Sequence, residues 1–126
     1  ILICGGGMMG SAIAQVLAGL DDVTITVYDK FPVDIEAKIR NNMKLLVEKE
    51  IVTPADVDKV ISKISFTQDI ESEGVKNADL VVECVLEDMQ LKQDLFTAGR
   101  HCFRRYDLLY KYIRYEPYRN FCKMQT

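Results

Sequence analysis

The chain has 126 residues, of which 48% are hydrophobic and 28% are charged, and its formal net charge at pH 7 is −3. This length suits one domain, and the apolar fraction is sufficient to form a core. No apolar run approaches the length of a membrane span, so we expect no membrane-spanning segment, and no signal-peptide pattern is present.

The first predicted elements are a strand over residues 1–4 and a helix over residues 11–18. They are joined by a glycine-rich turn made of Gly5, Gly6, Gly7, Met8, Met9 and Gly10. The spacing Gly5-x-Gly7-x-x-Gly10 is typical of a loop that holds a pyrophosphate at a helix N-terminus. In that interpretation Gly5 permits the turn, Gly7 lets backbone N–H groups approach the phosphates, and Gly10 lets the helix pack against the strand.

The next predicted element is a strand over residues 23–28, which ends at Asp29, nineteen residues after Gly10. An acidic residue at about this spacing is placed to accept hydrogen bonds from the ribose hydroxyls of adenosine. Because a carboxylate there repels a 2′-phosphate, the sequence favours NAD over NADP as the cofactor. The alternative is a structural turn in which Asp29 merely caps the residues that follow.

Helices and strands are predicted to alternate up to residue 96. Apolar residues at helical spacing predict a long helix over 31–50, and Thr53-Pro54 predicts the start of a short helix that ends near residue 61. The later predictions are a strand over 64–67, a short helix or turn over 69–76, a strand over 80–85 and a helix over 89–96. This order is typical of the α/β class, here a Rossmann-type doubly wound parallel sheet that is incomplete and has a helical insertion after strand 2.

Some polar side chains are expected inside buried strands. Glu83 interrupts an apolar run typical of a strand buried on both faces, and its ionised carboxylate needs a partner or a ligand there. Cys4 and Cys84 fall in similar runs, which predicts reduced, buried thiols. The chain has four cysteines and no C-x-x-C pair, so we expect no metal site and no disulfide.

Two longer motifs resemble a known family. They are Gly5-Gly6-Gly7-Met8-Met9-Gly10-Ser11-Ala12-Ile13-Ala14-Gln15 and Asp79-Leu80-Val81-Val82-Glu83-Cys84-Val85-Leu86-Glu87-Asp88-x-x-Leu91-Lys92-x-x-Leu95-Phe96. Together with Asp29 and the inserted helices, they resemble the NAD-binding domain of 3-hydroxyacyl-CoA dehydrogenases, including the 3-hydroxybutyryl-CoA type. The resemblance runs from Ile1 to Phe96 and then stops.

The resemblance implies an enzyme that oxidises a 3-hydroxyacyl-CoA to a 3-oxoacyl-CoA with NAD in fatty-acid or butyrate metabolism. It implies that the glycine loop holds the pyrophosphate, that Asp29 holds the ribose, and that Glu87 and Lys92 contact the nicotinamide side. An alternative for this last pair is a cap carboxylate and a solvated lysine. The family's catalytic histidine and glutamate lie beyond the matching part, so no catalytic residue is assigned, His101 included, and this fragment is expected to be inactive alone.

The resemblance also implies an acyl-CoA substrate in the full-length enzyme and a homodimer formed through a C-terminal domain that is missing here. No nucleic-acid or membrane partner is expected. The alternative function is a non-catalytic NAD-binding or structural module, as in lens crystallins of the same fold. Because the chain begins inside a strand and without Met, we expect residues before Ile1 to be missing. The predicted location is cytoplasmic, with a mitochondrial or peroxisomal one left open.

The composition changes abruptly after residue 96. Up to that point nine Lys and Arg face seventeen Asp and Glu, whereas from Thr97 onward the numbers are seven and two, with five of the six tyrosines. We therefore divide the chain into a partial NAD-binding Rossmann domain over 1–96 and an aberrant basic, aromatic tail over 97–126 that is not a domain. The tail is expected to be irregular or loosely packed. The alternative is a tail that binds single-stranded nucleic acid.

We hypothesise that a change of reading frame, either real or a sequencing artefact, accounts for the tail. Codons that can be chosen for residues 103–124, because Arg, Leu and Ser have several, can spell S-G-G-T-I-C-S-T-N-T-S-V-M-S-L-I-E-I-S-A-K-C when moved forward by one base, and the family continues with T-I-x-x-[TS]-N-T-S. The codons of Tyr110, Lys111 and Tyr112 restrict the shifted residues to Thr or Ile, then Asn or Ser, then Thr or Ile. The hypothesis is a one-base frameshift near Thr97.

Overall fold

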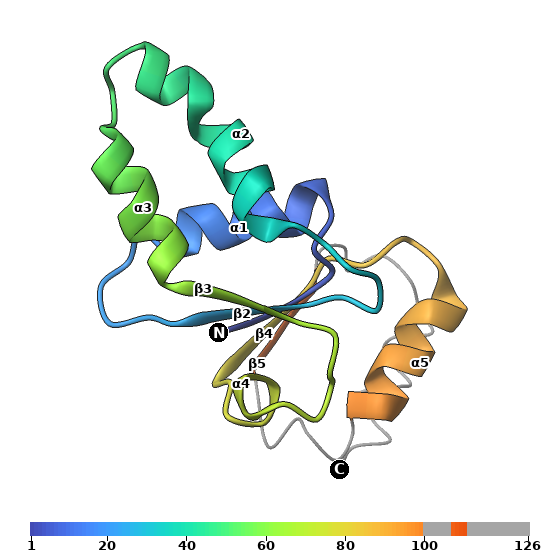
Figure 1. Cartoon of the computed structure of the whole chain (residues 1–126). Helices are drawn as coiled ribbons and strands as arrows, with labels where there is room; N and C mark the ends of the chain where they lie inside the picture. Colours follow the sequence, from blue (N-terminus) through green and yellow to red (C-terminus); the bar gives the residue numbers. More distant parts are fainter. Residues whose placement is uncertain (100–106, 111–126) are drawn as a thin grey trace.

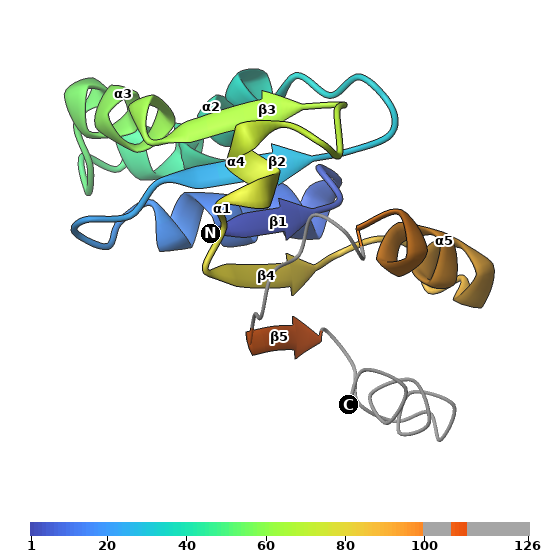
Figure 2. The ribbon, with the colours of Figure 1, turned by 90° about the horizontal axis from the view of Figure 1, so that it is seen from below.

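The computed structural model describes residues 1–99 and 107–110, which form a parallel sheet with helices on both of its faces (Figure 1). The sheet has five strands, β1 (Leu2–Cys4), β2 (Ile25–Tyr28), β3 (Ile64–Thr67), β4 (Leu80–Glu83) and β5 (Asp107–Tyr110). Their order across the sheet is β3-β2-β1-β4-β5, and every neighbouring pair is parallel (Figure 2). The predicted doubly wound α/β fold is confirmed.

The helices are α1 (Met8–Leu17), α2 (Ile35–Glu48), α3 (Pro54–Ser62), α4 (Glu73–Lys76) and α5 (Met89–Gly99). Helices α1, α2 and α3 lie on one face of the sheet, and α4 and α5 lie on the other (Figure 1). The pair α2 and α3 forms the predicted insertion between β2 and β3. Within residues 1–99 and 107–110, none of the helices is long and apolar enough to cross a membrane.

Alternation along the central strands provides two apolar cores. Ile3 of β1 and Val27 of β2 point to the face covered by α1 and α2, where they pack with Ile39. Leu2 and Cys4 point to the other face and pack with α4 and α5, among them Leu95 of α5. Each large apolar side chain buried in this way stabilises the fold by about 1.5–3 kcal/mol. The sheet is therefore buried on both faces, as the apolar strands predict.

Local capping explains where the predicted helix boundaries succeed and where they are wrong. Helix α3 begins as predicted because the Thr53 hydroxyl accepts from the Asp56 N–H while the Asp56 carboxylate accepts from the Thr53 N–H, a capping box. Helix α2 begins at Ile35 and not at residue 31, because the Asp34 side chain caps it by accepting from the Ala37 N–H at 2.9 Å.

The expectation of irregular structure in the tail is wrong for four residues. Residues 107–110 are not irregular but form strand β5, which pairs in parallel with β4 from Leu80 opposite Asp107 to Glu83 opposite Tyr110. Residues 97–99 of the tail continue helix α5, and the remaining expectations for the tail, His101 included, concern positions that lie outside the described residues.

Candidate functional site

The crevice of this sheet lies at the carboxyl ends of β1 and β4. The chain leaves β1 toward β2 on one side, while β4 and β5 continue the sheet on the other side, so β1 and β4 flank the point where the strand order reverses. Open α/β sheets bind ligands at this point. The register brings Cys4, Tyr28 and Glu83 level with one another, so the loops that follow these strands meet at one edge.

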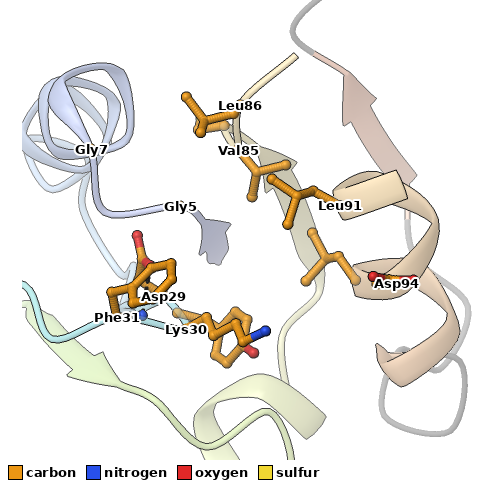
Figure 3. Close-up of a pocket in the computed structure, with 12 residues that line it drawn as sticks. Gly5, Gly7, Asp29, Lys30, Phe31, Val85, Leu86, Leu91 and Asp94 are labelled. Carbon is orange, nitrogen blue, oxygen red and sulfur yellow. Dashed lines mark hydrogen bonds between the residues drawn. The ribbon is translucent and has the colours of Figure 1, made fainter. Parts of the chain in front are cut away.

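A cavity of about 450 Å³ opens at that edge (Figure 3). This volume is in the range of small-molecule and cofactor sites. Its lining residues come from the end of β2, from the loops after β1, β2 and β4 and from α5, and they are Gly5, Gly7, Tyr28, Asp29, Lys30, Phe31, Cys84, Val85, Leu86, Leu91, Asp94 and Leu95. Three predicted site residues, Gly5, Gly7 and Asp29, are thus brought together on one cavity.

Gly5 and Gly10 are required by the backbone. Gly5 has φ of 105°, and a Cβ there would lie 2.8 Å from the carbonyl carbon and oxygen of Cys84. A Cβ on Gly10 would overlap the carbonyl oxygen of Gly5 and lie 3.4 Å from the Ile3 side chain. The predicted roles of these two glycines, the turn and the close packing of helix on strand, are confirmed by this geometry.

Gly7 differs from the other two because nothing in the structure crowds it. It is the exposed N-cap residue of α1, no side chain caps that helix, and a Cβ on Gly7 would have no heavy atom within 4 Å. The next residues, Met8 and Met9, are exposed and do not line the cavity. A ten-residue helix therefore presents its uncapped N-terminus beside the cavity, an arrangement that favours an anion.

Asp29 lies between the glycine loop and the cavity. Its Oδ2 accepts from the Gly6 N–H at 2.7 Å, and its Oδ1 accepts from the Phe31 N–H at 3.0 Å. The second bond is the local capping that the structural alternative predicts, but the first reaches across 23 residues to the glycine loop. A carboxylate offers about four lone-pair positions, so Asp29 retains acceptor capacity toward the cavity.

Lys30, Phe31 and the apolar wall of the cavity were not predicted. Phe31 is 69% exposed and faces the cavity from the loop after β2, while Val85 and Leu91 face it from the opposite side (Figure 3). Two signals in the sequence point to these residues. Positions directly after parallel strands lie at the carboxyl edge, and Leu91 and Leu95 have the i, i+4 spacing of one helix face.

Glu87 and Lys92 do not line the cavity, and they bind each other instead. Lys92 is 4% exposed, and its Nζ lies 3.0 Å from Glu87 Oε2 and 3.0 Å from Glu83 Oε2. The alternative of a solvated lysine is therefore wrong, and the residue that caps α5 is Asp88, which accepts from the Leu91 N–H at 3.0 Å. The partner that Glu83 needs inside its buried strand is Lys92.

The thiols of the described part behave as predicted. Cys4 and Cys84 are buried, and neither forms a disulfide. Burial, with the nearby Glu83 carboxylate and Cys84 thiol as smaller causes, raises the pKa of the Cys4 thiol well above its usual range. Among residues 1–99 and 107–110 no three His, Cys, Asp or Glu side chains form a group that could hold a metal ion.

A parallel sheet in this order, with a glycine loop and an acidic residue at its crevice, defines a dinucleotide-binding domain of the Rossmann type. The sequence model of the family described as 3-hydroxyacyl-CoA dehydrogenase, NAD binding domain, matches residues 1–109. The chain belongs to this family, whose cofactor is NAD. The match extends beyond residue 96, where the recognisable motifs end, to the residues of β5.

Individual relatives agree with this assignment. The chain is 36% identical over 106 residues to a probable 3-hydroxybutyryl-CoA dehydrogenase of Bacillus subtilis, an alignment that covers 81% of this chain and 36% of that protein. It is 33% identical over 98 residues to the fatty acid oxidation complex subunit alpha of Shewanella loihica, covering 75% and 14%. The crystal structure of M. tuberculosis FadB2 superposes with a TM-score of 0.71 at 25% identity, covering 88% and 40%. The chain spans less than half the length of each of these proteins.

The residues present fit NAD. An uncapped helix N-terminus with a side-chain-free residue, Gly7, suits a diphosphate, and Asp29 on the same cavity suits a ribose diol. The apolar wall opposite Phe31 suits a flat ring. Within the described residues, however, Gly5, Gly7 and Asp29 alone of the predicted positions line the cavity.

Proposed function

We propose that this chain forms the NAD-binding part of an enzyme that oxidises a 3-hydroxyacyl-CoA to a 3-oxoacyl-CoA. The observation that carries the proposal is the position of Gly7 and Asp29 on one cavity at the crevice of the sheet, in a chain of this family. The names of the relatives from Bacillus subtilis and Shewanella loihica support the substrate class and its place in fatty-acid oxidation.

Each predicted site residue has a role in this proposal. The backbone N–H groups after Gly7 bind the pyrophosphate, and Asp29 accepts hydrogen bonds from the adenosine ribose. Gly6 orients Asp29, and Gly5 and Gly10 keep the loop tight. Met8 and Met9 begin the helix that binds the phosphates, while Glu87 and Lys92 serve the nicotinamide side.

When bound, NAD supplies the acceptor for the hydride that leaves the substrate carbon. The hydroxyl proton of the substrate must pass to a base, and no such base is assigned within residues 1–99 and 107–110. This chain therefore binds and orients the cofactor and does not complete the reaction alone. An acyl-CoA-binding, dimer-forming C-terminal domain in the full-length enzyme belongs to the same proposal, and the cytoplasmic location stays a prediction.

The frameshift hypothesis is part of this proposal. In the shifted reading the family's strand begins at positions 106 and 107, and β5 occupies Asp107–Tyr110. This coincidence supports an origin of the tail in the family's own coding sequence.

Two measurements test the proposal. The coding DNA should contain AAA at Lys111, which gives asparagine in the shifted frame, whereas AAG would give serine and contradict the shifted N-T-S. The product of the gene with its frame restored should reduce NAD with 3-hydroxybutyryl-CoA, measured by the absorbance of NADH, and the present chain should not. A frame-restored protein that binds NAD but oxidises no 3-hydroxyacyl-CoA would favour the non-catalytic module instead.

A further inference from the structure

Glu83 is a fully buried carboxylate at the carboxyl end of β4. Its Oε1 accepts from the Val85 N–H at 2.7 Å, and its Oε2 lies 3.0 Å from Lys92 Nζ. A buried carboxylate is costly unless it is paired and hydrogen-bonded; Glu83 is hydrogen-bonded through Oε1 and ion-paired with Lys92 through Oε2. Because apolar residues in place of the buried Glu83–Lys92 pair often serve a core equally well, the presence of the two charges calls for an explanation beyond packing.

Lys92 connects this buried charge to an exposed one. Its ammonium lies between Glu83 and Glu87, 3.0 Å from a carboxylate oxygen of each, and the Glu87 side chain is 61% exposed. The network Glu83–Lys92–Glu87 contains one cation and two anions. A negative charge therefore remains, and it is accessible at Glu87.

The network spans the connection between β4 and α5. Glu83 is the last residue of β4 and Lys92 lies in the first turns of α5, and the residues between them include Cys84, Val85 and Leu86, which line the cavity. The bond from Val85 to Glu83 closes the start of this connection, and the bond from Lys92 to Glu87 closes its end. The network thus fixes one wall of the cavity.

Glu87 lies on the side of the crevice that one half of a bound dinucleotide would occupy. Asp29 and Phe31 follow β2 on one side of β1, whereas Glu87 follows β4 on the other side. A dinucleotide lies across the crevice with its pyrophosphate at the glycine loop, so its two halves extend to opposite sides of β1. With the adenosine half at Asp29, the half nearer Glu87 is the nicotinamide riboside.

We propose that Glu83 is a positioning residue for the nicotinamide half of the cofactor and acts through Lys92, which holds Glu87 in place. This inference rests on the proposed function. A hydroxyl or carboxamide N–H of the nicotinamide riboside is the donor that the exposed Glu87 carboxylate would accept. Lys92 serves as the link between the buried and the exposed carboxylate.

The test compares two ligands that share the adenosine diphosphate ribose and differ in nicotinamide. Dissociation constants for NAD and for ADP-ribose are measured by calorimetry on the full chain, its Glu83→Gln and Glu87→Gln variants, and Glu48→Gln as a control. Glu48 is an exposed acid on α2, across the sheet. We expect both site variants to weaken NAD binding by about tenfold and ADP-ribose binding by less than about twofold. The control should change neither.

The Glu83→Gln variant could fail to fold because it leaves the buried Lys92 ammonium with less counter-charge. A second variant keeps the test decisive in that case. The double variant Glu83→Gln/Lys92→Met removes both buried charges and keeps the side-chain lengths similar. It should show the same loss of NAD binding with ADP-ribose binding retained.

Two results would overturn the inference about Glu83 and leave the proposed function standing. NAD and ADP-ribose affinities that fall together in the folded variants would mean a purely structural role for Glu83, and unchanged NAD binding in Glu87→Gln would break the link to the cofactor. A full chain that binds neither ligand would instead overturn the proposed function, so the two failures are distinguishable.

Discussion

The backbone N–H of Gly6 donates a 2.7 Å hydrogen bond to Oδ2 of Asp29, and this bond joins the glycine loop to the end of β2. The two residues are 23 positions apart in the sequence. The glycine loop and the Asp29 carboxylate both face the cavity, and this hydrogen bond makes the position of one depend on the other. Asp29 holds the loop in shape in addition to its proposed contact with the ribose.

The first prediction concerns this double role. Asp29→Ala removes both the ribose contact and the bond to Gly6, so it should weaken ADP binding more than AMP binding, because ADP depends more on the loop. Asp29→Asn keeps an acceptor oxygen for the Gly6 N–H and should weaken both ligands by a similar factor. Calorimetric titration of the two nucleotides against each variant measures this, and equal losses in Asp29→Ala would argue for a ribose contact alone.

The second prediction separates folding from binding within the glycine loop. A Cβ on Gly10 would overlap the Gly5 carbonyl, so Gly10→Ala should destabilise the fold by about 1–3 kcal/mol. A Cβ on Gly7 meets open space, so Gly7→Ala should leave the fold almost unchanged and weaken NAD binding by occupying the phosphate position. Thermal unfolding and NAD titration of both variants provide the check. The reverse pattern, an unstable Gly7→Ala and a stable Gly10→Ala, would contradict this assignment.

Much of this architecture could be predicted from the sequence because its signals are local. Strand β3 was predicted with its exact bounds by alternation, and α3 by the Thr53-Pro54 start. The predicted start of α2 is wrong because the capping side chain, Asp34, lies inside the apolar pattern from which the helix was predicted. The cavity wall was missed because it depends on which loops the sheet order brings together. The sequence indicates that the buried Glu83 needs some partner, but it does not identify Lys92 as that partner.

The third prediction concerns the capping box of α3. Hydrogen bonds from the Thr53 hydroxyl and the Thr53 backbone N–H lower the pKa of Asp56 from its ordinary value of 3.8. Because the pKa is lowered in the folded state, the stabilisation is present above pH 3.8 and is lost as the pH falls through the lowered pKa. Thr53→Ala should lower the free energy of unfolding at pH 7 by about 1 kcal/mol. It should also reduce the loss of stability between neutral and acid pH, measured by urea unfolding, whereas an unchanged acid dependence would contradict the stated cause.

The fourth prediction concerns the two buried thiols. Because burial raises the pKa of Cys4, its thiolate should be scarce at mildly alkaline pH, and iodoacetamide should leave Cys4 unmodified until the protein is unfolded. Cys84 lines the cavity, so any modification of Cys84 in the folded chain should decrease when NAD is added. Peptide mapping by mass spectrometry reads both sites in one experiment. Labelling of Cys4 in the native protein at the rate of an exposed thiol would contradict the described core.

The central claim is tested most directly by calorimetric titration of NAD against the unmodified chain, Asp29→Ala and Gly7→Val. We expect that the unmodified chain binds NAD and that both variants lose affinity by about tenfold or more while they stay folded. Equal affinity in all three proteins would contradict the assignment of this cavity as the cofactor site.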